Sequence, residues 1–167
     1  MSTSCYIGDA DPDNPHVVRA RFVLADGHPG VMLPTLAAIW AGHARHDTRA
    51  LITAILARDW EHLDPAITAA ACGARGRRPV LGVGMPLTRT TTTGGVVDAP
   101  EPLTVFPLCH AGHLDAERIY LIEADTTMIA VHTGDGTRLG AYPLTACLPS
   151  PTPGRRPYPP RPAGVRE

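Results

Sequence analysis

Residues 118–142 read RIYLIEADTTMIAVHTGDGTRLGAY, and this stretch decides the fold class. It contains three runs rich in β-branched and apolar residues, at 118–124, 127–133 and 138–142, which favours strands. Short turn sequences separate the runs, Glu-Ala-Asp-Thr at 123–126 and Gly-Asp-Gly at 134–136. Because both connections are short, the three strands are predicted to pair as an antiparallel meander.

The first of these strands has apolar side chains on both faces. Ile119 and Leu121 alternate with Tyr120 and Ile122, so neither set is suited to water. A strand that is apolar on both sides is covered on both sides. We therefore expect this strand to lie in the centre of the sheet.

The N-terminal part of the chain predicts a β-hairpin. Residues 4–8 form one strand candidate, and residues 16–25 alternate apolar and polar side chains as a half-buried strand does. Residues 9–15 between them are dense in Asp, Asn and Pro. A connection of this length excludes a two-residue turn. A further strand is expected at 103–108.

Two amphipathic helices are predicted after the hairpin. Residues 31–43 carry apolar side chains at helical spacing, with Pro34 expected in the first turn, where a missing N–H donor is harmless. Asp47 is a good N-cap for a second helix, which we expect to end near Trp60 or His62. The predicted fold class is α+β, an antiparallel β-sheet with two α-helices packed on one face.

The length of 167 residues fits one globular domain, predicted at 1–148. The tail at 149–167 holds seven prolines and four arginines, and is predicted to be flexible and to lie outside the core. All 15 basic residues of the chain are arginines, against 16 acids, giving a net charge of −1. The tail has a net charge of +3, so the remaining residues 1–148 have a net charge of −4 and are weakly acidic. A weakly acidic body disfavours a broad nucleic-acid-binding surface.

The sequence predicts a cytoplasmic protein that does not enter membranes. No apolar run approaches the length of about 18 residues needed to span a bilayer. The first residues lack the basic region and apolar stretch of a signal peptide. Four cysteines, at positions 5, 72, 109 and 147, form no Cys-x-x-Cys motif, and reduced thiols are expected.

One cluster has residue types that bind zinc. Cys109, His110 and His113 lie within five residues, and the glycine between the two histidines would let the loop curl around an ion. Such a site would need a fourth ligand from elsewhere and would suit a small metal-dependent hydrolase. The alternative is that these are structural or surface side chains, as chance pairs arise readily among eight histidines.

A second cluster suits phosphate groups. Arg75, Arg77 and Arg78 form a basic loop that, with the arginines of the tail, could contact nucleic acid or an acidic partner surface. Solvated arginines are the alternative. The sequence has neither the phosphate-binding loop ending in Lys-Ser/Thr nor a Rossmann fingerprint, so no cofactor is predicted.

The turn Asp26-Gly-His-Pro29 connects the second strand to the first helix. It places His28 near the helix N-terminus and allows Asp26 to cap a backbone amide. It is either a structural turn or part of a binding surface. Carboxylates at Glu123 and Asp125 sit in a turn, and we interpret them as solvated turn residues.

Part of the chain resembles a group of small phage and prophage proteins. The likeness rests on Ser2-Thr3, Ile7-Gly8, the segment 18–23, the segment 26–29 and Leu36. Those proteins carry a Tyr-Val-His-Trp-Asp-Gly-Tyr-Pro signature before a helix. Here Leu24 and Ala25 stand where the signature has His and Trp, and His28 stands where it has Tyr.

The remainder is similar to uncharacterised actinobacterial proteins of integrative elements and plasmids. This likeness lies in the segments 25–29, 39–40 and 59–64. The resemblance carries no catalytic residue. It implies a non-catalytic accessory or regulatory protein of a phage or integrative mobile element that acts by binding a protein partner. The alternatives are a nucleic-acid-binding regulator of replication or transfer, and the metal-dependent hydrolase. The oligomeric state is left open.

Overall fold

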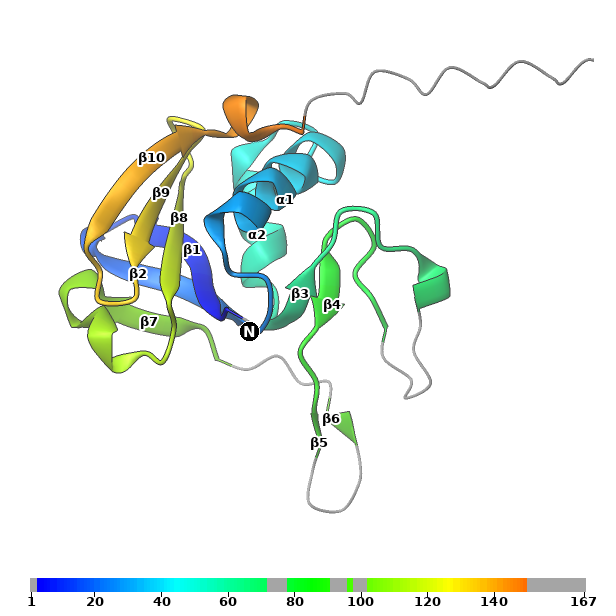
Figure 1. Ribbon diagram of the computed structural model, residues 1–167, viewed down its shortest axis with the longest axis horizontal. Helices are drawn as coiled ribbons and strands as arrows, with labels where there is room; N and C mark the ends of the chain where they lie inside the picture. Colours follow the sequence, from blue (N-terminus) through cyan, green and yellow to red (C-terminus); the bar gives the residue numbers. More distant parts are fainter. Residues whose placement is uncertain (1–2, 72–77, 91–95, 98–101, 150–167) are drawn as a thin grey trace, which may run out of the picture.

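The computed structural model describes residues 3–71, 78–90, 96–97 and 102–149, and it is built around one curved sheet (Figure 1). The sheet has eight strands in the order β10-β9-β8-β1-β2-β3-β4, with β7 also paired to β2. A separate two-stranded ribbon pairs β5 with β6. The strands are β1 (Cys5–Asp11), β2 (Asn14–Val23), β3 (Trp60–Leu63), β4 (Gly84–Pro86), β5 (Arg89–Thr90), β6 (Val96–Val97), β7 (Thr104–Pro107), β8 (Arg118–Glu123), β9 (Met128–Thr133) and β10 (Arg138–Pro143).

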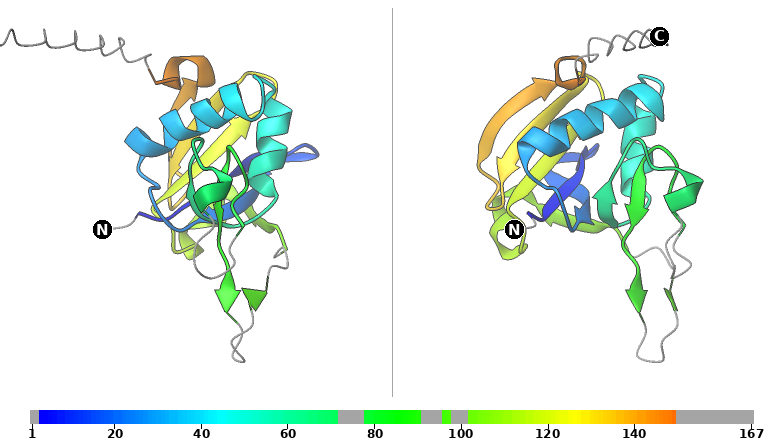
Figure 2. Two further views of the ribbon diagram at one scale, coloured as in Figure 1. Left: turned by 90° about the vertical axis from the view of Figure 1, so that its right-hand side faces the viewer. Right: turned by 45° about the vertical axis from the view of Figure 1, so that its right-hand side comes forward.

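Both helices, α1 (Pro29–Gly42) and α2 (Thr48–Leu56), cover one face of this sheet (Figures 1 and 2). Their apolar sides meet the inward side chains of β1, β8 and β9 in the larger of two cores. Trp40 and Trp60 are both buried there, among the side chains of the helices and the sheet. The predicted α+β class, with two helices on one face, is therefore confirmed.

The opposite face of the sheet has a smaller core. The 3₁₀ helix η2 (Leu108–His113) covers it, and β7 contributes to it from within the sheet, where it pairs with β2. Its buried members include Phe106 of β7, Ala111 of η2, and Ile119 and Leu121 of β8. With Tyr120 and Ile122 in the larger core, β8 is apolar on both faces and lies between β9 and β1. The central position predicted for this strand is confirmed, as is the antiparallel meander of β8, β9 and β10.

The sheet is mostly antiparallel, with two parallel contacts that the sequence did not predict. β1 pairs parallel with β8 over Cys5 to Gly8, and β2 meets β3 in parallel at Val23 and Trp60. Two amides continue the second contact, Leu24 donating to the carbonyl oxygen of Trp60 and Ala25 to that of Glu61, each over 3.0 Å. The β1–β8 pair joins the N-terminal hairpin to the C-terminal meander.

The prediction of a long hairpin connection is wrong. β1 extends to Asp11 and β2 begins at Asn14, so only Pro12 and Asp13 lie between the strands. A register shift between Ala10 and Asp11 lets the polar residues at the hairpin end join the ladder. Asp11 and Asn14, which are residue types common in turns, are therefore the last paired residues of the two strands.

Two helix boundaries also differ from expectation. The first helix begins at Pro29, which places Pro34 in the second turn and not in the first. The second helix starts after its N-cap Asp47, as predicted, but ends at Leu56. Residues 60–63 form β3 instead of a last helical turn, because their backbone pairs with β2 and β4.

Among the described residues, no helix is both long and apolar enough to cross a membrane. Cys5, Cys109 and Cys147 are free thiols. The predicted tail lies outside the described residues from position 150 onward.

Candidate functional site

A crevice opens where β1 and β8 diverge. The ladder between these parallel strands ends at Gly8 and Leu121. β1 continues to Asp11 as part of the hairpin with β2, whereas β8 continues to Glu123 beside β9. Beyond these residues of the described chain, β1 stays paired with β2 and β8 with β9 but not with each other, and the crevice lies at the carboxyl ends of the two parallel strands.

The crevice has a volume of about 770 Å³, which is in the usual range for ligand sites. Its walls are the hairpin end, α2, the β8–β9 turn, and parts of β9, β10 and η2. Charged, polar and apolar residues line it together, among them Asp9, Asp11, Arg19, Arg49, Ile52, Thr53, Leu108, Leu121, Glu123, Asp125, Ala130, His132 and Arg138. Ile52 belongs to the larger core, whereas Leu121 and Ala130 belong to the smaller one. The crevice thus touches both faces of the sheet.

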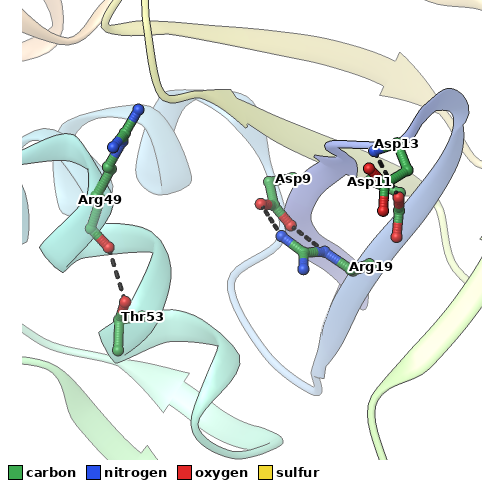
Figure 3. A network of polar contacts seen from close by, with 6 residues as sticks. All are labelled: Asp9, Asp11, Asp13, Arg19, Arg49 and Thr53. Atoms are coloured by element: carbon green, nitrogen blue, oxygen red, sulfur yellow. Dashed lines mark hydrogen bonds and ion pairs between the residues drawn. The ribbon is translucent and has the colours of Figure 1, made fainter.

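A fixed ion pair forms one wall. Asp9 and Arg19 are directly opposite each other on β1 and β2. Arg19 donates from Nη2 to Asp9 Oδ2 over 2.5 Å and from Nε to Oδ1 over 3.2 Å. This two-point contact with Asp9 raises the pKa of Arg19, and Figure 3 shows the pair facing α2, where Arg49 and Thr53 lie. Fork-to-fork pairing restricts both side chains, so this wall is rigid.

Two looser ion pairs stand at the rim. Arg49 Nη2 lies 3.6 Å from Asp125 Oδ1, and these side chains are 81% and 88% exposed. Arg138 Nη2 lies 3.8 Å from Glu123 Oε1, with 58% and 41% exposure. Both distances exceed that of a normal hydrogen bond. Such exposed pairs contribute little to stability and are easily exchanged.

His132 lines the crevice from β9 and is only 6% exposed. Its Nδ1 lies 3.1 Å from the carbonyl oxygen of Gly136. A carbonyl oxygen can only accept, so Nδ1 carries a proton and donates it to this contact. One nitrogen of the ring is therefore committed within the β9–β10 hairpin.

The end of the hairpin is held by local side-chain contacts. Asp13 donates its backbone N–H to Asp11 Oδ1 over 2.9 Å, visible in Figure 3. On the other strand, His16 donates its N–H to Asn14 Oδ1 over 3.1 Å. These contacts order the wall that carries Asp9 and Asp11.

The structure places the predicted Asp26–His28 turn away from the crevice lining, at the start of α1. His28 is the N-cap, and its Nδ1 accepts the N–H of Gly30 over 3.1 Å. The cap is therefore His28 rather than Asp26, which is exposed and has a positive φ of 66°. Gly27 ties the turn to the sheet, since its N–H donates to Thr3 and its carbonyl oxygen accepts from the Tyr120 hydroxyl.

The predicted zinc ligands Cys109, His110 and His113 all lie in η2 and are exposed. The helix ends with a hydrogen bond from the N–H of Leu114 to Ala111, so these residues form a short cover segment. Within the described ranges, no group of three or more His, Cys, Asp or Glu side chains has a metal-binding arrangement. No fourth ligand joins this segment from the part of the chain that the structure describes.

Of the predicted basic loop, only Arg78 is described, and it is exposed. Arg75 and Arg77 lie outside the described residues, as do the arginines of the tail. The nucleic-acid hypothesis therefore stays a prediction.

The sequence did not reveal the crevice, although it contained a signal. Asp9, Asp11 and Asp13 alternate at period two, which indicates a strand bearing acids on one face. Glu123 and Asp125 were interpreted as solvated turn residues, yet they face this hairpin from more than 100 residues away in the chain. Only the β1–β8 pairing brings the two groups together.

The comparisons with known proteins are negative. No family model matches the chain, and no curated protein or solved structure matches it either.

Proposed function

We propose that this chain is a non-catalytic accessory or regulatory protein that holds a segment of a partner protein in the crevice between β1 and β8. The observation that carries the proposal is the divergence of these strands after Gly8 and Leu121. Beyond that point, no ladder joins Asp9–Asp11 of β1 to the end of β8 in the described chain. Two strand edges therefore face a solvent-accessible crevice.

The shape of the crevice favours an extended polypeptide over a compact molecule. The lining comes from both faces of the sheet, so an occupant that contacts all of it must pass between the strands. An extended chain is narrow and can pair its backbone with an exposed strand edge. Apolar side chains such as Ile52 and Leu121 provide contacts for its alternating side chains.

Two hydroxyl groups of the lining are bonded within the chain. Thr53 donates to the carbonyl oxygen of Arg49 over 2.9 Å, and Thr126 donates to Glu123 over 2.7 Å. Neither hydroxyl is hydrogen-bonded to His132, so neither has the imidazole partner that activates a serine-type or threonine-type nucleophile.

Site-specific photo-crosslinking in the native host tests this function. A photoreactive amino acid at Thr53 stands in the crevice wall, and the same group at Val31, exposed on α1, is the matched control. We expect one partner segment to crosslink at Thr53 and not at Val31. The purified partner should then bind the wild-type chain and lose affinity for Thr53→Trp, which adds bulk to the wall. Equal crosslinking at both positions, or no effect of Thr53→Trp, contradicts the proposal.

The association with a phage or an integrative mobile element is part of the same proposal and rests on the resemblance of the N-terminal segment. Its test is the gene neighbourhood. We expect integrase, transfer or replication genes beside the gene for this chain. A neighbourhood of housekeeping genes across several genomes contradicts this part and leaves the crevice proposal standing.

A further inference from the structure

The crevice carries an excess of negative charge. Its lining contains four carboxylates, those of Asp9, Asp11, Glu123 and Asp125. It contains three arginines, at positions 19, 49 and 138. The fixed pair of Asp9 and Arg19 neutralises itself at close range. Three carboxylates and two arginines remain to meet an occupant.

The two remaining arginines are easily displaced. Arg49 and Arg138 contact their carboxylates only at 3.6 and 3.8 Å, and both are more than half exposed. An incoming cation can therefore take their place at Asp125 and Glu123, while the displaced guanidinium groups return to water. An incoming anion would meet the carboxylate of Asp11, which is half-buried in the opposite wall.

The fixed wall favours the same class of ligand. Arg19 already donates from Nε and Nη2 to Asp9. Guanidinium and ammonium groups have only donors. A basic side chain therefore fits the carboxylates of the lining, whereas a carboxylate ligand would find the arginine of the fixed wall already paired.

Building on the proposed function, we infer that the partner segment held in the crevice is extended and basic, and that its arginine or lysine side chains exchange with Arg49 and Arg138 at Asp125 and Glu123. The apolar side chains of the segment then contact Ile52 on one face and Leu121 on the other. The chain's own arginines keep the carboxylates paired when the crevice is empty.

The test uses peptides of defined charge with the full-length, isotope-labelled chain. The first probe is an acetylated and amidated hexapeptide that alternates valine and arginine. The second replaces each arginine by glutamate, and the third is spermidine, a cation without a peptide backbone. Nuclear magnetic resonance titration locates each probe and measures its affinity. We expect the arginine peptide to perturb the resonances of Glu123, Asp125 and His132, and to bind at least about tenfold more tightly than the glutamate peptide.

Variants separate the crevice from general surface charge. Asp125→Asn removes one rim carboxylate and should weaken binding of the arginine peptide about fivefold, the upper effect of an exposed ion pair. The matched control is Asp115→Asn, since Asp115 is exposed and lies before β8, outside the lining. It should change the affinity less than twofold. Equal losses in both variants would overturn the inference, because binding would then follow net charge alone.

The remaining outcomes distinguish this inference from the proposed function. Tighter binding of the glutamate peptide in the crevice overturns the basic character of the segment and leaves a peptide-binding crevice in place. If spermidine binds as tightly as the arginine peptide and perturbs the same resonances, the ligand of the crevice is a free polyamine. Both the basic peptide segment and the proposed peptide-binding function are then wrong. If no probe perturbs the crevice at millimolar concentration, the inference is wrong, and crosslinking at Thr53 decides the proposed function separately.

Discussion

The guanidinium group of Arg21 donates from Nε to the carbonyl oxygen of Leu56, the last residue of α2, over 2.8 Å. Arg21 is on β2 and only 5% exposed. Its Nη1 also lies 3.9 Å from Asp59, whose Oδ1 accepts the N–H of Phe22. The end of α2 receives a second cap from the indole N–H of Trp60, which donates to the carbonyl oxygen of Ile55 over 2.9 Å. Long side chains from the sheet thus satisfy the end of α2, where many helices use glycine.

This cap makes Arg21 a stability determinant. Arg21→Met keeps the length of the side chain but leaves the carbonyl oxygen of Leu56 and the carboxylate of Asp59 without this partner. We expect the free energy of unfolding to fall by about 2–4 kcal/mol, as for a buried charged group that loses its partner. Urea unfolding of the full chain measures it. Arg49→Met, at an exposed site on α2, should change stability by less than about 0.5 kcal/mol. Similar losses in both variants would refute the capping role.

Gly8 at the root of the crevice should not tolerate a side chain. A Cβ at this position would overlap the carbonyl oxygen of Arg19 and lie 2.7 Å from the Cα of Ala20. Because backbone atoms cannot move aside cheaply, Gly8→Ala should cost about 2–3 kcal/mol of stability. Gly42→Ala is the matched control, since no neighbouring atom lies within 4 Å there. Thermal unfolding compares the two, and a stable Gly8→Ala protein would contradict the close approach of β1 and β2.

The chain should lose stability under alkaline conditions because of Cys5 and Tyr120. Burial raises the pKa of the Cys5 thiol above its ordinary value of 9.0 and that of the Tyr120 phenol above 10.0. The folded chain holds these two protons more tightly than the unfolded chain does. Each group therefore stabilises the fold fully below its pKa in the unfolded chain, and this stabilisation is lost as pH rises. The unfolded state then releases protons that the folded state retains.

Cys5 should lower the free energy of unfolding by up to about 1.4 kcal/mol per pH unit above about pH 9, and Tyr120 by a similar amount above about pH 10. Cys5→Ala should remove the part of this slope that begins near pH 9, and Tyr120→Phe the part that begins near pH 10. Denaturant titrations from pH 7 to pH 11 measure both slopes. An unchanged pH dependence in Cys5→Ala would show that the thiol does not resist ionisation.

The two helix N-caps predict changes of opposite sign. Asp47 accepts the N–H groups of Arg49 and Ala50 with one carboxylate oxygen, so Asp47→Ala should cost about 1 kcal/mol. His28 caps α1 with an imidazole nitrogen, which is a less favoured cap. His28→Asp should therefore stabilise the chain by about 0.5 kcal/mol, because a carboxylate also interacts well with the helix dipole. Calorimetry of both variants checks the signs, and a destabilised His28→Asp would point to a further role for the imidazole.

Local chemistry in the sequence was sufficient for most of the secondary structure. The Asp47 cap, the apolar stripe that follows it and the alternation in the meander are each set by residues close together in the chain. The same reasoning misplaced the end of α2, because Trp60–Leu63 is a four-residue strand. A segment this short shows no periodicity that separates a strand from a helix end.

The sequence by itself determined an α+β chain with two helices on one face of a sheet, because helical and strand periodicity and helix capping act within a few residues. Only the tertiary structure decided that Gly8 would pair with Leu121 and that their strands would then separate. This pairing joins segments more than 100 residues apart, and its energy comes from burial in both cores rather than from any local pattern. The crevice between the hairpin end and the β8–β9 turn exists only because of that long-range contact.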